Sequence, residues 1–447
     1  MGSKLVWTGA INGALRELPA DSQDCTAALS QRLREELEKG ALPMISLGFL
    51  DEMSSAIERL TPRLRRYKHL LLLGIGGSAL GPRALQKAFA PGQDGPCHDG
   101  PSLWVMDNVS TEQLESWLSR LPAQDTLVLC ISKSGGTIET MAQFFLVRDW
   151  LKRELGPAHA SQIITVSDPK PNLLRREAEE NDYLTLPVPE GLGGRYSIIS
   201  AVGMLPAAFL GIDWREFLRG VQSVMKPLAT APEHLSLHPA WRMSCWAKAL
   251  MDVDYSQLIF FSYIPAWSAF GAWFAQLWAE SLGKENQGSM PVPATGVTDQ
   301  HSLLQMFLDG RKDKGCLFIT GSKVSRGPMF QAPLPAEFAF LENQRLGDLL
   351  KAETLGTAMA LEASGVPLLC FETEYANERG AGELMALCML MTLFTGWRMG
   401  INPLDQPAVE LGKRLAKARL GANGLKEEKA ALDRFLSKQD EIVELGE

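Results

Sequence analysis

The stretch His69-Leu70-Leu71-Leu72-Leu73-Gly74-Ile75-Gly76-Gly77-Ser78 carries the strongest fold signal in this chain. Its apolar run at 69–73 predicts a buried strand, and the glycine turn leads into a helix-length segment at 79–89. Further apolar runs separated by helix-length segments follow at 103–106, 126–131 and 163–166. Such alternation predicts right-handed crossovers and a parallel sheet with helices on both faces, so we expect the α/β class.

A second set of apolar runs predicts a second α/β unit. These runs lie at 258–263, 316–320 and 367–372, and no sequence period links them to the first set. The 447-residue length is compatible with roughly two or three units. We expect a helical N-terminal arm over 1–65, a first α/β domain over 66–205, and a second over 206–447 that ends in a charged helical tail. The segment 181–194, rich in proline and glycine, is the expected linker.

Composition and charge exclude several classes of protein. A net charge of −8 with both signs interspersed leaves no basic stripe for nucleic acid. The seven cysteines are scattered without a C-x-x-C pair, as expected of reduced thiols. The apolar segment 258–279 is broken by Pro265 and polar residues, which predicts a strand and a buried helix rather than a membrane span. With no signal pattern at the N-terminus, we expect a cytoplasmic protein.

The turn Gly74-Ile75-Gly76-Gly77-Ser78 is suited to an approaching phosphate. Glycines remove the Cβ barrier, and the free N–H groups of the following helix attract an anion. The same residues half-match the dinucleotide fingerprint, with Gly74, Gly76 and Ala79 in register and Asp107 near the end of the next strand. A nicotinamide-dependent dehydrogenase is therefore a competing hypothesis, and glycines that only permit tight packing are another.

A second turn, Ser132-Lys133-Ser134-Gly135-Gly136-Thr137, follows the predicted strand at 126–131. Its three hydroxyls, one ammonium group and glycine-exposed amides make a compact receptor for a single dianionic phosphate. A dinucleotide fold does not need such a turn. A helix cap with a solvated lysine explains the hydroxyls but not the whole combination.

Glu280-Ser281-Leu282-Gly283-Lys284 ends a helix-length segment whose aromatic residues recur at helical spacing, which predicts a buried face. Gln276 and Glu280 are four residues apart and share one face, so a carboxylate stands in a narrow polar slot. An exposed helix end is the alternative for Glu280, and a capping or core role is the alternative for His301. Together with Arg195 after its glycine pair, His301 and Lys413, these motifs predict a sugar-phosphate site with an acid/base carboxylate.

His234 and His238 have a spacing that could bind zinc. Glu233 precedes the first histidine rather than following it, and Pro232 and Pro239 flank the segment. We therefore expect no metal site.

Six motifs occur in the order in which the glucose-6-phosphate isomerase family carries them, and the chain resembles that family from about residue 70 to 415. The motifs are Leu73-Gly74-Ile75-Gly76-Gly77-Ser78, Ser132-Lys133-Ser134-Gly135-Gly136-Thr137, Gly193-Gly194-Arg195-Tyr196-Ser197, Glu280-Ser281-Leu282-Gly283-Lys284, Gln300-His301 and Asp405-Gln406-Pro407-Ala408-Val409-Glu410-Leu411-Gly412-Lys413. The compact length resembles the shorter bacterial-type members.

The resemblance implies two sugar-isomerase (SIS) type units of three αβα layers, a cytosolic homodimer with shared active sites, no cofactor, and a place in glycolysis and gluconeogenesis. It also implies roles for residues. Glu280 would shuttle the proton, Arg195 would face the enediolate, and His301 and Lys413 would assist ring opening. The implied substrate-binding residues are Gly77, Ser78, Ser132, Lys133, Ser134, Thr137, Gln276 and Gln406.

The expected reaction is reversible interconversion of glucose 6-phosphate and fructose 6-phosphate. Alternatives remain open. Another SIS-type enzyme would share the phosphate turn, although a glutamine-dependent aminotransferase would need an amidotransferase source that this N-terminus lacks. A dual isomerase that also accepts mannose 6-phosphate has the same sequence features. A sugar-phosphate sensor would keep the turn at 132–137 without needing Glu280, Arg195, His301 and Lys413 together.

Overall fold

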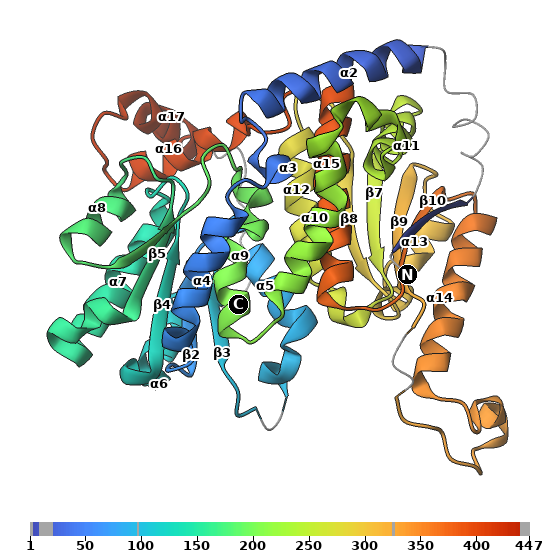
Figure 1. Ribbon diagram of the computed structural model, residues 1–447, viewed down its shortest axis with the longest axis horizontal. Helices are drawn as coiled ribbons and strands as arrows, with labels where there is room; N and C mark the ends of the chain where they lie inside the picture. Colours follow the sequence, from blue (N-terminus) through green and yellow to red (C-terminus); the bar gives the residue numbers. More distant parts are fainter. Residues whose placement is uncertain (1–2, 9–20, 96–97, 324–326, 439–447) are drawn as a thin grey trace.

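The computed structural model describes residues 3–8, 21–95, 98–323 and 327–438, which fold around two five-stranded sheets (Figure 1). The first sheet contains, in spatial order, β3 (Ser102–Met106), β2 (His69–Leu73), β4 (Thr126–Ile131), β5 (Ile163–Ser167) and β6 (Leu184–Pro187). All its strand pairs are parallel. Its crossover helices are α5 (Leu80–Phe89), α6 (Thr111–Arg120), α7 (Ile138–Leu155) and α8 (Leu173–Glu180).

The first sheet is buried on both faces. Leu70 and Leu72 pack in one apolar cluster, whereas Leu71 and Leu73 pack in another. Because successive side chains of a strand point to opposite faces, helices must cover both sides of β2. The predicted three-layer unit is confirmed here.

The second sheet repeats this architecture with one exception. It contains, in spatial order, β1 (Lys4–Thr8), β10 (Leu368–Thr373), β9 (Lys314–Gly321), β7 (Gln257–Ser262) and β8 (Met290–Thr295). Every pair is parallel except β1 with β10. Leu258 and Phe260 face one apolar cluster, and Ile259 and Phe261 face the other. The α/β fold class with two αβα units is therefore confirmed.

The prediction of a purely helical N-terminal arm is wrong for residues 4–8. They form β1, in which Lys4 pairs with Glu372 and Thr8 with Leu368. Leu5 and Trp7 pack against the core while Lys4 and Val6 are exposed, the alternation expected of an edge strand. The described helices of this arm fit the prediction, and they are α2 (Asp21–Glu38), α3 (Pro43–Ser46) and α4 (Leu50–Leu64).

Two edge strands lie in segments that the sequence did not mark as strands. β6 lies inside the expected linker at 181–194 and completes the first sheet beside β5. β8 contains Pro291 and Pro293 and pairs with β7. The two prolines are two residues apart, so the positions of their missing N–H groups lie on the same side of the strand. Because β8 is an edge strand, this can be the outer side, where no neighbouring strand requires a hydrogen-bond donor.

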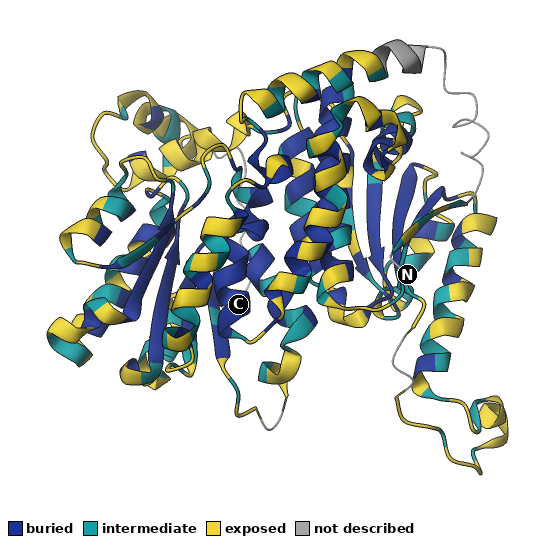
Figure 2. Cartoon of the chain, in the orientation of Figure 1, coloured by how far each residue is buried: buried dark blue, intermediate teal, exposed yellow. Residues whose placement is uncertain are grey.

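The two units pack against each other through helices rich in buried residues (Figure 2). The remaining helices are α9 (Ala201–Phe209), α10 (Trp214–Thr230), α11 (Pro239–Asp252), α12 (Phe270–Leu282), α13 (Leu304–Leu308), α14 (Leu346–Ala363), α15 (Glu378–Arg398), α16 (Glu410–Arg419) and α17 (Lys426–Leu436). By length and hydropathy α15 could cross a membrane, but its apolar window is 100% buried, so it is a core helix. The segment at 258–279 forms β7 and most of α12, as predicted.

Candidate active site

The candidate site lies where the strand order of the first sheet reverses. From β2 the chain crosses to β3 on one side, and β4 then pairs with β2 on the other. Loops that leave such neighbouring strands diverge, which opens a binding position beyond their carboxyl ends. The glycine turn at 74–78 and the hydroxyl turn at 132–137 both occupy this edge, so the structure brings the two predicted phosphate-binding turns together.

The hydroxyls of the second turn converge on one point. Ser132 Oγ donates to Thr137 Oγ1 at 3.1 Å, and the Ser134 and Thr137 hydroxyls lie 3.4 Å apart. The backbone N–H of Gly136 points to Ser134 Oγ at 3.4 Å. Ser132 is buried, while Ser134 and Gly136 are exposed. The turn thus presents hydroxyl and amide donors to solvent from a fixed base at the start of α7.

Gly135 is required by the shape of this turn. Its φ is +62°, and an added Cβ would lie 1.8 Å from the side-chain oxygen of Asn172. Asn172 caps α8 by accepting from the Arg175 N–H at 2.9 Å, and its amide donates to the Asp168 carbonyl at 3.1 Å. Asn172, at the start of α8, therefore packs directly against the turn at 132–137 and holds its shape.

The glycine turn makes backbone contact with the segment that carries Arg195. A Cβ on Gly77 would lie 2.2 Å from the carbonyl oxygen of Gly194, so only glycine allows this approach. Gly76 lies against the side chain of Gln276, because a Cβ there would be 2.7 Å from its amide nitrogen. The turn, the 3₁₀ helix Gly194–Ile199 and α12 consequently meet at one place.

Arg195 is 3% exposed and is held on every side. Its guanidinium donates to Ser281 Oγ at 2.7 Å and to Gln406 Oε1 at 2.8 Å. It also donates to the carbonyls of Pro403 and Asp405 at 2.6 and 3.0 Å. One nitrogen, Nη1, lies 3.3 Å from the carboxylate of Glu280. The fixed fork of donors is therefore immobilised with its charge beside that carboxylate.

Glu280 occupies the last turn of α12 between Arg195 and Gln276. Gln276 Nε2 donates to Glu280 Oε1 at 2.9 Å, which confirms that the two share one helix face. The Glu280 side chain is 31% exposed, so a ligand can reach the carboxylate while the arginine behind it is out of solvent. Such a group can accept and return a proton next to a permanent positive charge.

Lys133 adds a second positive charge to the site. Burial lowers the pKa of its ammonium group, and Arg195 nearby acts in the same direction, whereas Asp168 opposes the shift. The influence of Arg195 links the phosphate turn electrostatically to the arginine–carboxylate pair. An incoming dianionic phosphate would stabilise the charged form of Lys133.

A cluster of contacts that the sequence did not single out holds the turn at 402–406 onto the end of α12. Lys284 pairs with the Asp405 carboxylate at 2.9 Å and donates to the carbonyls of Ser281 and Asn402. The hydrogen bond to Lys284 lowers the pKa of Asp405. Together with Arg195, this clamp fixes Gln406 next to the guanidinium. Ser281, Lys284 and Asp405 lie within the quoted motifs, but their residue types alone gave no reason to assign them roles.

Two predicted residues are not joined to this cluster by a hydrogen bond or an ion pair among the described residues. His301 is exposed on the 3₁₀ turn Thr298–His301, which follows β8 of the second sheet. Lys413 is exposed on α16 and pairs with Glu410 at 2.7 Å. Ser78 and Gly77 lie at the glycine turn, and Gln406 lies at the guanidinium. The structure thus brings together the two turns, Arg195, Glu280, Gln276 and Gln406, and among the described residues it shows no hydrogen bond or ion pair from His301 or Lys413 to them.

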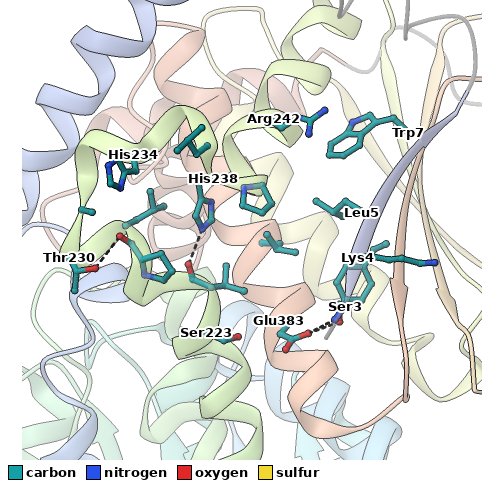
Figure 3. Close-up of a pocket in the computed structure, with 18 residues that line it drawn as sticks. Ser3, Lys4, Leu5, Trp7, Ser223, Thr230, His234, His238, Arg242 and Glu383 are labelled. Atoms are coloured by element: carbon teal, nitrogen blue, oxygen red, sulfur yellow. Dashed lines mark hydrogen bonds between the residues drawn. The ribbon is translucent and has the colours of Figure 1, made fainter. Parts of the chain in front are cut away.

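A separate cavity of about 820 Å³ contains none of the predicted site residues (Figure 3). It lies between β1, α10 and α11 and includes His234 and His238. His238 uses both ring nitrogens, with Nε2 2.9 Å from the Val224 carbonyl and Nδ1 accepting from the Ala240 N–H at 3.2 Å. It has no free nitrogen for a metal. Within the ranges that the structure describes, no group of three or more His, Cys, Asp or Glu residues could hold a metal ion.

Comparison with known proteins fits this geometry. A family model described as phosphoglucose isomerase matches residues 52–330. The glucose-6-phosphate isomerase of Rubrobacter xylanophilus is 36% identical over 363 residues, 79% of this chain and 82% of that protein. The enzyme of the same name from Carboxydothermus hydrogenoformans is 33% identical over 413 residues, 89% of each chain. The crystal structure of a hypothetical protein from Thermus thermophilus has a TM-score of 0.82 at 29% identity, covering 94% of this chain and 100% of that one. The chain therefore belongs to the phosphoglucose isomerase family.

Proposed function

We propose that this protein is a glucose-6-phosphate isomerase that interconverts glucose 6-phosphate and fructose 6-phosphate. The observation that carries the proposal is the contact of Glu280 with both Arg195 and Gln276 beside a phosphate-binding turn. The named relatives over most of the chain support the same reaction. As one of the soluble enzymes of glycolysis and gluconeogenesis, it would act in the cytoplasm.

Aldose–ketose exchange requires a proton to move from C2 to C1 of the open-chain sugar. Ser132, Lys133, Ser134 and Thr137 bind the phosphate and so fix the sugar chain relative to Glu280. The Glu280 carboxylate removes the C2 proton, and the resulting carboxylic acid returns it to C1. In the same exchange the C2 hydroxyl gives up a proton and the C1 oxygen gains one, a transfer assigned to His301 with Lys413. As the enediolate oxygen becomes negative, the fixed charge of Arg195 stabilises it without competing for the proton, because a guanidinium carries a permanent positive charge.

Ring opening needs a second acid/base group, and His301 and Lys413 are assigned to it. Since no hydrogen bond or ion pair among the described residues joins His301 to Glu280 of the same chain, we infer that a second copy of the chain supplies it in a homodimer. Exposed apolar side chains on the second unit support such a surface. Leu355 is 63% exposed and Met359 61%, and their i,i+4 spacing places both on one face of α14. Met306 on α13, next to the His301 turn, is also exposed.

The alternative functions do not account for all the residues of the site. A sugar-phosphate sensor needs the turn at 132–137 but not a proton acceptor beside a buried arginine. A dehydrogenase would use the glycine turn as a pyrophosphate cradle, yet Gly77 is packed against the Gly194 carbonyl. Mannose 6-phosphate differs from glucose 6-phosphate at C2, where the proton is removed, so a dual specificity stays open to assay.

The deciding experiment follows formation of glucose 6-phosphate from fructose 6-phosphate in a coupled assay without added metal. An active preparation that loses activity in the Glu280→Gln variant supports the proposal. Binding of fructose 6-phosphate without turnover would instead identify a sensor. Parallel assays with mannose 6-phosphate and with a nicotinamide cofactor test the other two functions.

A further inference from the structure

The turn that carries His301 is anchored to two other elements through the residue next to it. Gln300 Nε2 donates to the hydroxyl of Tyr263 at 2.6 Å and to that of Thr357 at 2.7 Å. Tyr263 in turn donates to Thr357 Oγ1 at 2.6 Å, which closes a triangle. Tyr263 follows β7 and Thr357 lies on α14, so one amide ties the turn to the sheet edge and to a long helix.

The triangle is buried and has little freedom. Tyr263 is 1% exposed and Thr357 4%. The ring of Tyr263 lies against Phe318, with the ring centroids 4.9 Å apart. Burial raises the pKa of Tyr263, so its hydroxyl keeps the proton that it donates to Thr357. Both hydroxyls are therefore fixed acceptors for Gln300 rather than mobile surface groups.

Two further contacts fix the backbone of the same turn. The Asp299 carboxylate accepts from the Thr295 N–H at 2.7 Å and from the Ser302 hydroxyl at 2.6 Å, which closes the turn on itself. Gly296 lies flat on Tyr263, since a Cβ there would be 2.4 Å from the ring. By contrast, the His301 side chain has no hydrogen bond to any other residue that the structure describes. His301 is therefore an exposed side chain on a turn whose neighbouring residues, Asp299 and Gln300, are fixed by hydrogen bonds.

We propose that Gln300, together with Tyr263 and Thr357, is a positioning device that fixes His301 for the reaction. This inference rests on the proposed function and deepens it, because it gives the buried triangle a purpose in ring opening. When an exposed side chain makes no hydrogen bonds of its own, its position depends on how firmly its backbone is held. A displacement of about 1 Å in a reacting group can cost roughly 100-fold in rate.

The chain offers a matched control on the same helix. Thr354 lies one turn before Thr357, but its hydroxyl donates to the Leu350 carbonyl of its own helix at 2.7 Å. We expect Gln300→Ala to lower kcat by about 10- to 100-fold, with a smaller change in KM because the phosphate turn is untouched. Thr357→Val and Tyr263→Phe should cause smaller losses of kcat. Thr357→Ser keeps the hydroxyl and should therefore retain native kcat. Thr354→Val should retain native kcat.

A double-mutant cycle separates positioning from general stabilisation. If Gln300 acts through His301, adding Gln300→Ala to the His301→Ala variant causes no further loss of kcat, whereas independent effects would multiply. Multiplicative losses, or a native kcat in Gln300→Ala, would overturn the inference. If Gln300→Ala fails to fold, the near-isosteric Thr357→Val and Tyr263→Phe variants provide the same cycle. An unmodified protein without isomerase activity would reject both the proposed function and this inference, whereas an active protein with a native-like Gln300→Ala variant would reject this inference alone.

Discussion

Glu280 and Gln276 lie one helical turn apart with 2.9 Å between amide nitrogen and carboxylate oxygen, so the carboxylate has a defined direction before substrate arrives. Glu280→Gln keeps the shape but removes the proton acceptor. We expect kcat to fall by about 10² to 10⁴ while binding of a phosphate-bearing inhibitor persists. The exposed Glu285, five residues further along the chain, provides the control Glu285→Gln, which should stay active. Near-native turnover in a pure Glu280→Gln sample would mean that another group is the base.

Arg195 satisfies five acceptors from a buried position, and lysine cannot reproduce that fork. Arg195→Lys should lower kcat by about 10² to 10³, the range seen when one oxyanion donor is lost, with a smaller effect on phosphate affinity. Arg215→Lys changes an exposed ion pair with Glu58 and should be nearly silent. A change confined to KM would move Arg195 from transition-state stabilisation to ground-state binding.

If Lys133 binds the substrate phosphate as proposed, phosphate binding should be sensitive to alkaline pH. Its pKa is lowered by burial, so the free protein loses this charge at a lower pH than an ordinary lysine would. The unfolded chain then binds more protons than the folded one, and the contribution of Lys133 to stability rises with pH between its two pKa values. Affinity for a phosphate-bearing inhibitor should fall over the same interval. Lys133→Arg should retain affinity there, because arginine stays charged. Inhibition constants measured across alkaline pH test this, and identical profiles for both proteins would contradict it.

Residue types and local spacing could predict the two turns at the ends of β2 and β4 and the shared helix face of Glu280 and Gln276, because each of these features depends on residues that are close in sequence. The supporting contacts could not be predicted. Arg195 bonds to Asp405, 210 positions away, and Asn172 supports Gly135 across the start of α8. A single sequence contains no measure of such distances. For the same reason Gly135 and Gly136 could not be told apart from the sequence, although only Gly135 has a positive φ and a close neighbour.

At the scale of elements, the central strands were predictable because both faces are buried and their sequences are continuous apolar runs. The edge strands were not. β6 and β8 carry prolines that usually mark loops, and β1 is five residues long with a weak alternation. Each of these edge segments becomes a strand because it pairs with a neighbouring strand that is distant in sequence or buried in the core. Tertiary pairing, rather than local preference, decided these three strands.

The turn between β4 and α7 allows a matched pair of substitutions. Gly135→Ala must place a methyl group 1.8 Å from Asn172 at a φ of +62°, whereas the nearest atom to a Cβ on Gly136 is 3.9 Å away. Gly135→Ala should cost about 1–3 kcal/mol of stability and weaken phosphate binding. Gly136→Ala should do neither. Thermal unfolding and inhibitor titration of both variants test the prediction, and equal behaviour of the two would show that the turn is not held by Asn172.

For the molecule as a whole, the two units share one core. The largest apolar cluster contains Leu70 of the first sheet, Leu258 of the second, and buried residues of α15. The candidate active site lies along this junction, because Arg195 and the glycine turn belong to the first unit and Glu280 to a helix of the second. Relative movement of the units would therefore disturb the Arg195–Glu280 contact directly.

A homodimer with shared sites makes a quantitative prediction. Two variants with low residual activity, Glu280→Gln and His301→Ala, are mixed in equal amounts, unfolded and refolded together. Random assortment makes half of the dimers mixed, and in a two-fold dimer each mixed pair has one site with both lesions and one intact site. About a quarter of native activity should return. If both residues acted within one chain, every site of a mixed dimer would keep one lesion. A sample shown to contain mixed dimers but lacking activity above the two parents would therefore exclude the shared site, and His301 would have to reach Glu280 by a rearrangement within its own chain.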